Sequence, residues 1–115
     1  MFGRNLMNTR VRAAEAALAD GRIDEAFACA ADPALRGQTR VQTLVDRLVR
    51  PLLARARLAA QRGDFHAALT DLDRLHLLSR ESDESRQLRQ RLVAEMQSRQ
   101  QDAQAKNAAA ARVSD

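Results

Sequence analysis

The sequence is short of several residue types, and each shortage excludes a class of protein. Cys29 is the only cysteine among the 115 residues, so no disulfide forms within the chain and nothing marks it as secreted. Four glycines and two prolines are too few for a disordered or collagen-like chain. Neither the opening MFGRNLMNTR nor any later stretch holds an apolar run long enough for a signal peptide or a membrane span. We therefore expect a cytoplasmic protein with no membrane partner.

Aromatic residues are equally scarce, since Phe2, Phe27 and Phe65 are the only ones. Hydrophobic residues still make up 45% of the chain, mostly as alanine and leucine, which favours a helical protein with a thin core. The 19 basic residues outnumber the 15 acidic ones, and all but one of the basic residues are arginine. A GC-rich genome produces many arginines and alanines without selection for function, so this excess alone says little about partners.

Two stretches match each other at a distance of 42 residues, AALADGRIDEAFACA from Ala16 and LAAQRGDFHAALTDL from Leu58. The positions that agree are the glycines and the apolar residues, in the pairs Gly21 and Gly63, Ile23 and Phe65, Ala26 and Ala68, and Phe27 and Leu69. The polar positions differ, so that His66 falls on Asp24. A repeated fold element has this pattern, whereas a catalytic constellation does not.

Each copy fits a helix–turn–helix, because glycine adopts the left-handed conformation that ends a helix. Asp64, directly after Gly63, is placed to cap the next helix. The strings GRIDEAF and GDFHAAL resemble the second helix of tetratricopeptide repeats, which opens with a glycine, a polar residue, an aromatic or aliphatic residue, two variable positions and an alanine. The spacing here is longer than in that family, and the aromatic and Leu-Gly signals of its first helix are absent. The resemblance implies helical hairpins that serve scaffolding and assembly.

The predicted fold is all-α, with about five helices in antiparallel hairpins, like a fragment of an α-solenoid. The chain forms a single domain, 1–115, with repeat-like units at 5–36 and 38–79 and a long C-terminal helix at about 83–112. Within the units we expect helices at about 5–20, 22–31, 38–62 and 64–78, and Pro51 should kink or break the third. The expected caps of later elements are Asp32 and either Ser82 or Asp83.

Apolar periodicity predicts which side chains form the core. Apolar residues of the third helix recur at steps of three and four, which places them on one face. We expect mutual packing and burial of Leu44, Leu48, Leu52, Phe65, Leu69 and Leu72. The first helix should direct inward Leu6, Val11, Ala14 and Leu18.

The segment from Gln97 to Asp115 has helix-forming alanines but no large apolar side chain until Val113. We expect it to project from the body, as it would if the chain were the N-terminal part of a longer protein. The competing hypothesis is that it folds back onto the third helix with its alanines as a close-packing surface.

One group of polar residues suggests a metal or acid–base site: His66, Thr70, Asp71, Asp73 and His76. One helical stripe supplies two ligands at most, whereas a transition metal needs three or four, so a solvated outer face is the preferred interpretation. Phosphate loops, paired-cysteine motifs and nucleophile elbows are absent from the sequence, so we predict no cofactor and no small-molecule substrate. Cys29 fits a small core residue better than a nucleophile.

The third helix also carries a concentration of positive charge. From Gln38 to Arg62 there are six arginines and one acid, six minus one or +5, so the rest of the chain is −1. Four of these arginines fall on one outer face: Arg40, Arg47, Arg50 and Arg57. Such a face binds phosphates or an acidic protein surface, unless its arginines pair with the acidic fourth helix. The helix lacks aromatics on which bases could stack, which disfavours binding to single strands.

Stacked helical hairpins offer long surfaces but few convergent polar groups, which favours recognition over catalysis. The sequence therefore predicts a non-catalytic protein–protein interaction or scaffolding module. Its partner would be another protein or a downstream part of the same chain. The alternative is an arginine-driven nucleic-acid-binding domain, and salt-dependent binding to random DNA or RNA separates the two.

Overall fold

The computed structural model describes residues 2–113, and these residues form helices without any strand. The elements are α1 (Phe2–Ala19), α2 (Ile23–Ala30), the short 3-10 helix η1 (Pro33–Leu35), α3 (Thr39–Gln61), α4 (Phe65–Leu77) and α5 (Asp83–Val113). The all-α prediction is confirmed for this part of the chain, although α1 begins earlier than expected. The predictions that extend to Met1, Ser114 and Asp115 lie outside the described residues.

Three helices end in the same way. At the end of α1 the Gly21 amide donates to the Leu18 carbonyl and the next amide to the Ala17 carbonyl, with the glycine at φ +80°. Gly63 ends α3 in the same geometry at φ +78°. Ser79 repeats it after α4 at φ +56° and is a residue that seldom adopts this conformation. Both glycines therefore lie in the turns that the sequence predicted.

The helix starts also follow from the sequence. The Asp64 carboxylate accepts a hydrogen bond from the Ala67 amide at 3.2 Å and so caps α4. Asp32 caps η1 in the same manner, with Pro33 at its first position. Ser82 caps α5 by exchanging hydrogen bonds with Ser85, each hydroxyl accepting from the other residue's amide. Of the two caps predicted for α5, Ser82 is therefore the one used.

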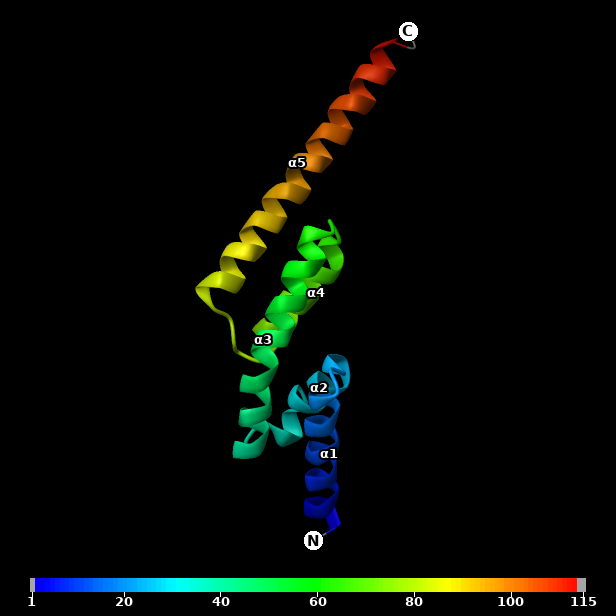
Figure 1. Cartoon of the computed structure of the whole chain (residues 1–115). Helices are drawn as coiled ribbons and strands as arrows, with labels where there is room; N and C mark the ends of the chain where they lie inside the picture. The colour runs from blue at the N-terminus through cyan, green and yellow to red at the C-terminus, as the bar shows by residue number, and fades with distance from the viewer. Residues whose placement is uncertain (1, 114–115) are drawn as a thin grey trace.

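The helices associate in sequential pairs (Figure 1). α1 packs on α2 and α3 packs on α4, and each pair is joined by a tight turn, so the two helices of a pair run in opposite directions. α2 also packs on α3, which joins the two pairs. α5 contacts α4 and α3 near its start and then extends beyond them (Figure 1).

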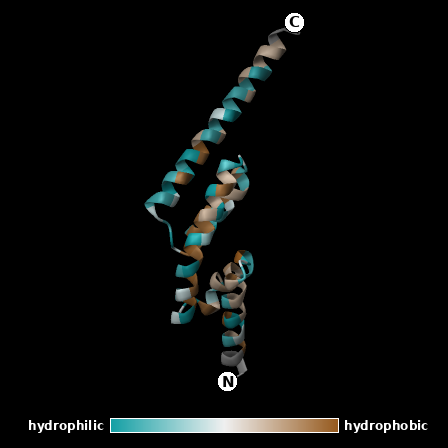
Figure 2. Cartoon of the chain, viewed as in Figure 1, coloured by the Kyte–Doolittle hydropathy of each residue, from teal (hydrophilic) through white to brown (hydrophobic). Residues whose placement is uncertain are grey.

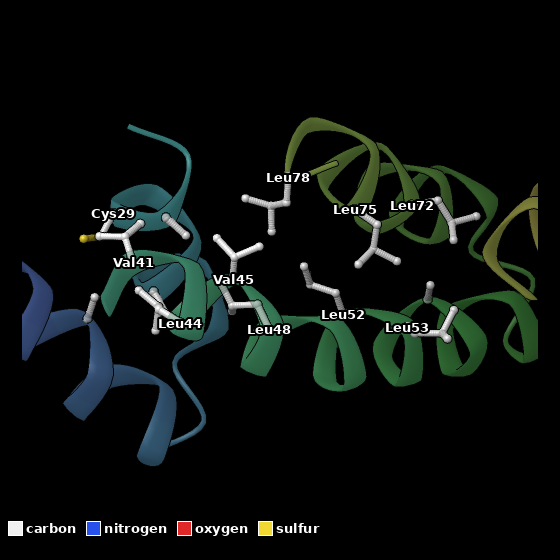
Figure 3. Packing of buried hydrophobic residues seen from close by; sticks show 14 of the residues in the cluster. Cys29, Val41, Leu44, Val45, Leu48, Leu52, Leu53, Leu72, Leu75 and Leu78 are labelled. Atoms are coloured by element: carbon white, nitrogen blue, oxygen red, sulfur yellow. The ribbon is translucent and has the colours of Figure 1, made fainter. Parts of the chain in front are cut away.

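The core follows the length of α3, whose buried residues face those of α4 and α2 (Figure 3). Leu44, Leu48 and Leu52 are buried as predicted, and so is Leu72 of α4. Hydrophobic residues are concentrated on α3 and α4, whereas α5 is mostly hydrophilic (Figure 2).

Two of the predicted core residues, Phe65 and Leu69, are only partly buried. The buried face of α4 is centred instead on Ala68, Asp71, Leu72 and Leu75. Asp71 thus lies on the buried face, where it pairs with Arg55, and Phe65 and Leu69 lie at the edge of that face.

In α1 the prediction is right for Val11 and Ala14, which are buried, while Leu18 is partly buried. Leu6 is 66% exposed, so its predicted inward position is wrong. It lies in the part of α1 that extends beyond the short α2 and so has no neighbouring helix to cover it.

Pro51 lies inside α3, and the helix continues through it, so the predicted break is wrong. Proline removes one amide donor, which leaves the Arg47 carbonyl without its usual helical partner. Arg47 and Arg50, on the same side of the proline, are exposed residues. Leu48, Leu52 and Leu53 are buried around the proline and hold the helix together.

The molecule is elongated, with extents of 75 × 26 × 24 Å. Its radius of gyration is 19.5 Å, whereas a compact chain of this length has a radius of about 13 Å. The difference arises largely from the projecting part of α5 (Figure 1). In the described part of the chain, no helix combines the length and the apolar character that crossing a membrane requires.

Candidate partner-binding surface

The four arginines of the predicted basic face all lie exposed along α3. Arg40 forms an ion pair of 2.6 Å with Glu15 of α1, and Arg57 forms one with Glu84 at the start of α5. The expectation that these arginines pair with α4 is therefore wrong for both. Each one instead links α3 to a different neighbouring helix.

Arg47 and Arg50, in the middle of the face, have no ion pair among the described residues. They lie three residues apart in α3, shortly before Pro51. Of the four arginines on this face, only Arg47 and Arg50 are therefore available to pair with a ligand.

A bidentate ion pair at the side of α3 that faces α4 involves a different arginine, Arg55. Arg55 donates two hydrogen bonds of 2.8 Å to the two carboxylate oxygens of Asp71, and a third of 2.7 Å to Asp24. Asp71 is only 3% exposed, so its charge depends on this bidentate partner. Arg55 thereby connects α2, α3 and α4.

Arg74 completes this ionic network. Its guanidinium contacts Asp24 and lies 3.4 Å from Asp71, and it stacks 5.1 Å above the centre of the Phe27 ring. The hydrogen bond from Arg55 is the main cause that lowers the pKa of Asp24, and burial opposes it. The same network raises the pKa of Arg55 above its ordinary value, chiefly through Asp71. The two arginines and two carboxylates thus form one ionic network that joins α2, α3 and α4.

This network was not among the predicted features, but the sequence contains a signal for it. Asp71 falls three residues after Ala68 and one before Leu72, on the apolar stripe of its helix, and Arg55 similarly falls between Leu52 and Ala56. A charge on an apolar stripe needs a partner of opposite sign, because an unpaired buried charge is costly. Two such residues on consecutive helices predict an ion pair.

The polar residues that suggested a metal site are dispersed. Neither His66 nor His76 converges with other ligands, and the residues that the structure describes contain no group of three or more His, Cys, Asp or Glu side chains able to hold a metal. His76 contacts Glu81 at 2.9 Å on the surface, and Asp73 pairs with Arg89 of α5. The Thr70 hydroxyl donates back to the His66 carbonyl within the helix.

Cys29 is buried in the core at 6% exposure. Burial raises the pKa of its thiol, which disfavours the reactive thiolate. Its position against Val41 (Figure 3) agrees with the prediction of a small core residue.

An open groove lies where α5 crosses the turn between α3 and α4. Its volume is about 500 Å³. Phe65, Leu88 and Leu92 supply apolar surface, and three arginines and one glutamate supply its charge. One of these arginines, Arg99, stacks 4.7 Å above the centre of the Phe65 ring. We name this feature the α5 groove. The sequence analysis did not anticipate it.

After Leu92, the side chains of α5 are exposed. From Val93 to Ala111 every side chain is exposed, including the large side chains of Val93 and Met96 at 40% and 39%. The prediction that the C-terminal stretch projects agrees with this arrangement. The competing hypothesis of a fold-back onto α3 is wrong for the residues described.

The chain was compared with family models, characterised proteins and solved structures, and none of the three comparisons found a match.

Proposed function

We propose that this chain is a non-catalytic protein-binding module built of tetratricopeptide-like helical hairpins, acting in the cytoplasm as a scaffold. The observation that carries the proposal is the exposed part of α5 after Leu92, which begins alongside the α5 groove and presents Val93 and Met96 to solvent. This helix has 31 residues, and from Val93 to Ala111 its side chains are all exposed, so packing adds little to the stability of this part. A partner that packs on this part of α5 would supply that stability and would bind along an extended surface.

The distribution of polar groups supports binding over chemistry. The buried carboxylate Asp71 and the exposed carboxylate Asp24 are both paired with Arg55 and Arg74. The two histidines are exposed and far apart along α4. Repetition of the hairpin around Gly21 and Gly63 supports the tetratricopeptide-like description, since both turns have the same backbone geometry.

Site-specific photo-crosslinking in cells tests this proposal. A photoreactive amino acid replaces Met96 on the uncovered part of α5, and in a matched control it replaces Asp20, which is exposed at the opposite hairpin tip. We expect a light-dependent protein adduct of discrete mass from position 96 and none from position 20. Equal adducts from both positions, or none from either, would contradict a partner-binding role for α5.

Nucleic-acid binding through α3 remains the second candidate function, because Arg47 and Arg50 are exposed and have no ion pair among the described residues. If these arginines contact phosphates, affinity for random duplex DNA should fall steeply with salt. Replacing both with glutamine should then reduce the slope of log affinity against log salt by about 2. An unchanged slope would eliminate this candidate.

A further inference from the structure

We propose that the α5 groove is the docking site for an acidic amphipathic helix of another protein. This inference rests on the proposed function, for which it names the partner's chemistry. The groove has the two features that such a helix needs, an apolar floor and a basic rim. Phe65 supplies the floor from α4, and Leu88 and Leu92 supply it from α5. Arg57, Arg91 and Arg99 form the rim.

The net charge of the groove lining indicates which charge the partner should carry. The lining contains three arginines and one glutamate, three minus one or +2. Arg99 is 3.5 Å from Glu95 and Arg57 pairs with Glu84, whereas Arg91 is exposed and has no ion pair among the described residues. Arg91 therefore offers an unneutralised charge beside Leu88 and Leu92, where an acidic side chain of a docked helix could approach it.

The size of the groove fits a short helix. From Leu88 to Arg99 the lining follows eleven residue steps of α5, or roughly 16 Å at 1.5 Å per residue. A helix lying along α5 with apolar side chains at three- and four-residue steps would place them on Phe65, Leu88 and Leu92. Acidic residues flanking that stripe would face Arg57 and Arg91.

A second copy of this chain lacks the required chemistry. α1 carries Arg4, Arg10 and Arg12 against Glu15 alone, three minus one or +2, which is the wrong sign. The exposed end of α5 from 100 to 111 has one acid, one lysine and no large apolar side chain.

The chain's own acidic helices are also occupied. Asp24 and Asp71 are bound by Arg55, and Asp73 is bound by Arg89. None of these helices is therefore free to serve as the acidic helix, and we assign that role to a partner outside these 115 residues.

The test uses a fluorescent designed peptide of about 16 residues, roughly four helical turns, with a leucine stripe flanked by glutamates. A second peptide replaces the glutamates with glutamine. Binding to the full chain is measured by fluorescence anisotropy for three proteins: the unaltered chain, Arg91→Glu and Arg47→Glu. The last is the matched control, because it makes the same charge change at an exposed arginine outside the groove that also has no ion pair among the described residues.

We expect saturable binding of the acidic peptide, weakened about tenfold by Arg91→Glu and less than about twofold by Arg47→Glu. Circular dichroism checks that both variants keep their helices. Equal affinity for the two peptides, or losses in the two variants that differ by less than about threefold, would overturn the proposal. If the acidic peptide fails while position 96 still crosslinks a protein in cells, only the partner's chemistry is wrong. If both fail, the proposed function is wrong as well.

Discussion

At the scale of single residues, Asp71 is a carboxylate that is almost completely shielded from water. It is buried, and Arg55 satisfies both of its oxygens. Replacing Arg55 with methionine would leave this carboxylate with Arg74 alone, 3.4 Å away. We expect a loss of about 2–3 kcal/mol in the free energy of unfolding, below the full cost for a buried pair because the Arg55 side chain is 36% exposed.

A second substitution identifies the cause of that loss. In the double variant Arg55→Met/Asp71→Leu no unpaired buried charge remains, so most of the stability should return. Arg22→Met is the control, since Arg22 pairs with Glu25 at the surface and should contribute less than about 0.5 kcal/mol. Urea denaturation followed by circular dichroism measures all four proteins. A double variant no more stable than Arg55→Met would show that the ion pair is not the source.

The same network predicts how stability depends on pH. Arg55 holds the pKa of Asp24 below its ordinary value. A carboxyl whose pKa is lowered by folding contributes stability above the pKa of the unfolded chain and loses it as the pH falls through the folded value. The contribution of Asp24 should therefore disappear below about pH 4.

Thermal unfolding between pH 7 and pH 3 measures this effect. The loss of stability in acid should be smaller for Asp24→Asn than for the unaltered chain, because the amide does not titrate. Asp20→Asn at the exposed hairpin tip provides the comparison. Identical acid profiles for Asp24→Asn and the unaltered chain would contradict a role for this carboxylate.

At the scale of helices and turns, the positive φ of the turn glycines leads to a direct prediction about stability. Gly63 has φ +78°, and a Cβ there would approach only the end of the flexible Arg99 side chain, at 3.9 Å. The cost of Gly63→Ala is therefore backbone strain, about 1–2 kcal/mol of unfolding free energy. Gly37→Ala is the matched control, because Gly37 does not have a positive φ and a Cβ there meets no atom within 4 Å. Equal stability of the two variants in urea would refute the argument.

The helices and their ends could be predicted from the sequence because they depend on local chemistry. Gly21 and Gly63 mark two turns, Asp64 and Ser82 cap the helices that follow, and the leucines of α3 share one face. The turn at Ser79 has no such mark, because serine rarely adopts a positive φ.

Features formed by contacts between helices were harder to predict. Phe65 was assigned to the core from its match with Ile23, but its burial depends on which face α4 turns toward α3, and that face includes Asp71, paired with Arg55. The α5 groove depends on the angle at which α5 leaves the second hairpin, which is not determined by any local pattern. The basic face of α3 was predicted from helical periodicity, yet its partners, Glu15 and Glu84, belong to helices whose positions the sequence did not reveal.

At the scale of the whole molecule, the fold consists of a thin core along α3 and one long helix that leaves it. The core contains mainly leucine, valine and alanine, and it ends near Leu92, the last buried residue of α5. The remainder of α5 extends the molecule to 75 Å without adding buried surface. This division is what makes α5 available to a partner.

Hydrogen exchange measured on the monomeric chain tests this division most directly. Amides of α3 from Leu44 to Ala56 should exchange only through global unfolding, because their side chains form the core. Amides from Gln97 to Ala111 should exchange near the rate of an unstructured peptide, since the side chains of this part of α5 are exposed and bury little apolar surface. Protection of the Gln97–Ala111 amides comparable to that of α3, in a confirmed monomer, would mean that this surface is already covered and would contradict its role as a binding surface.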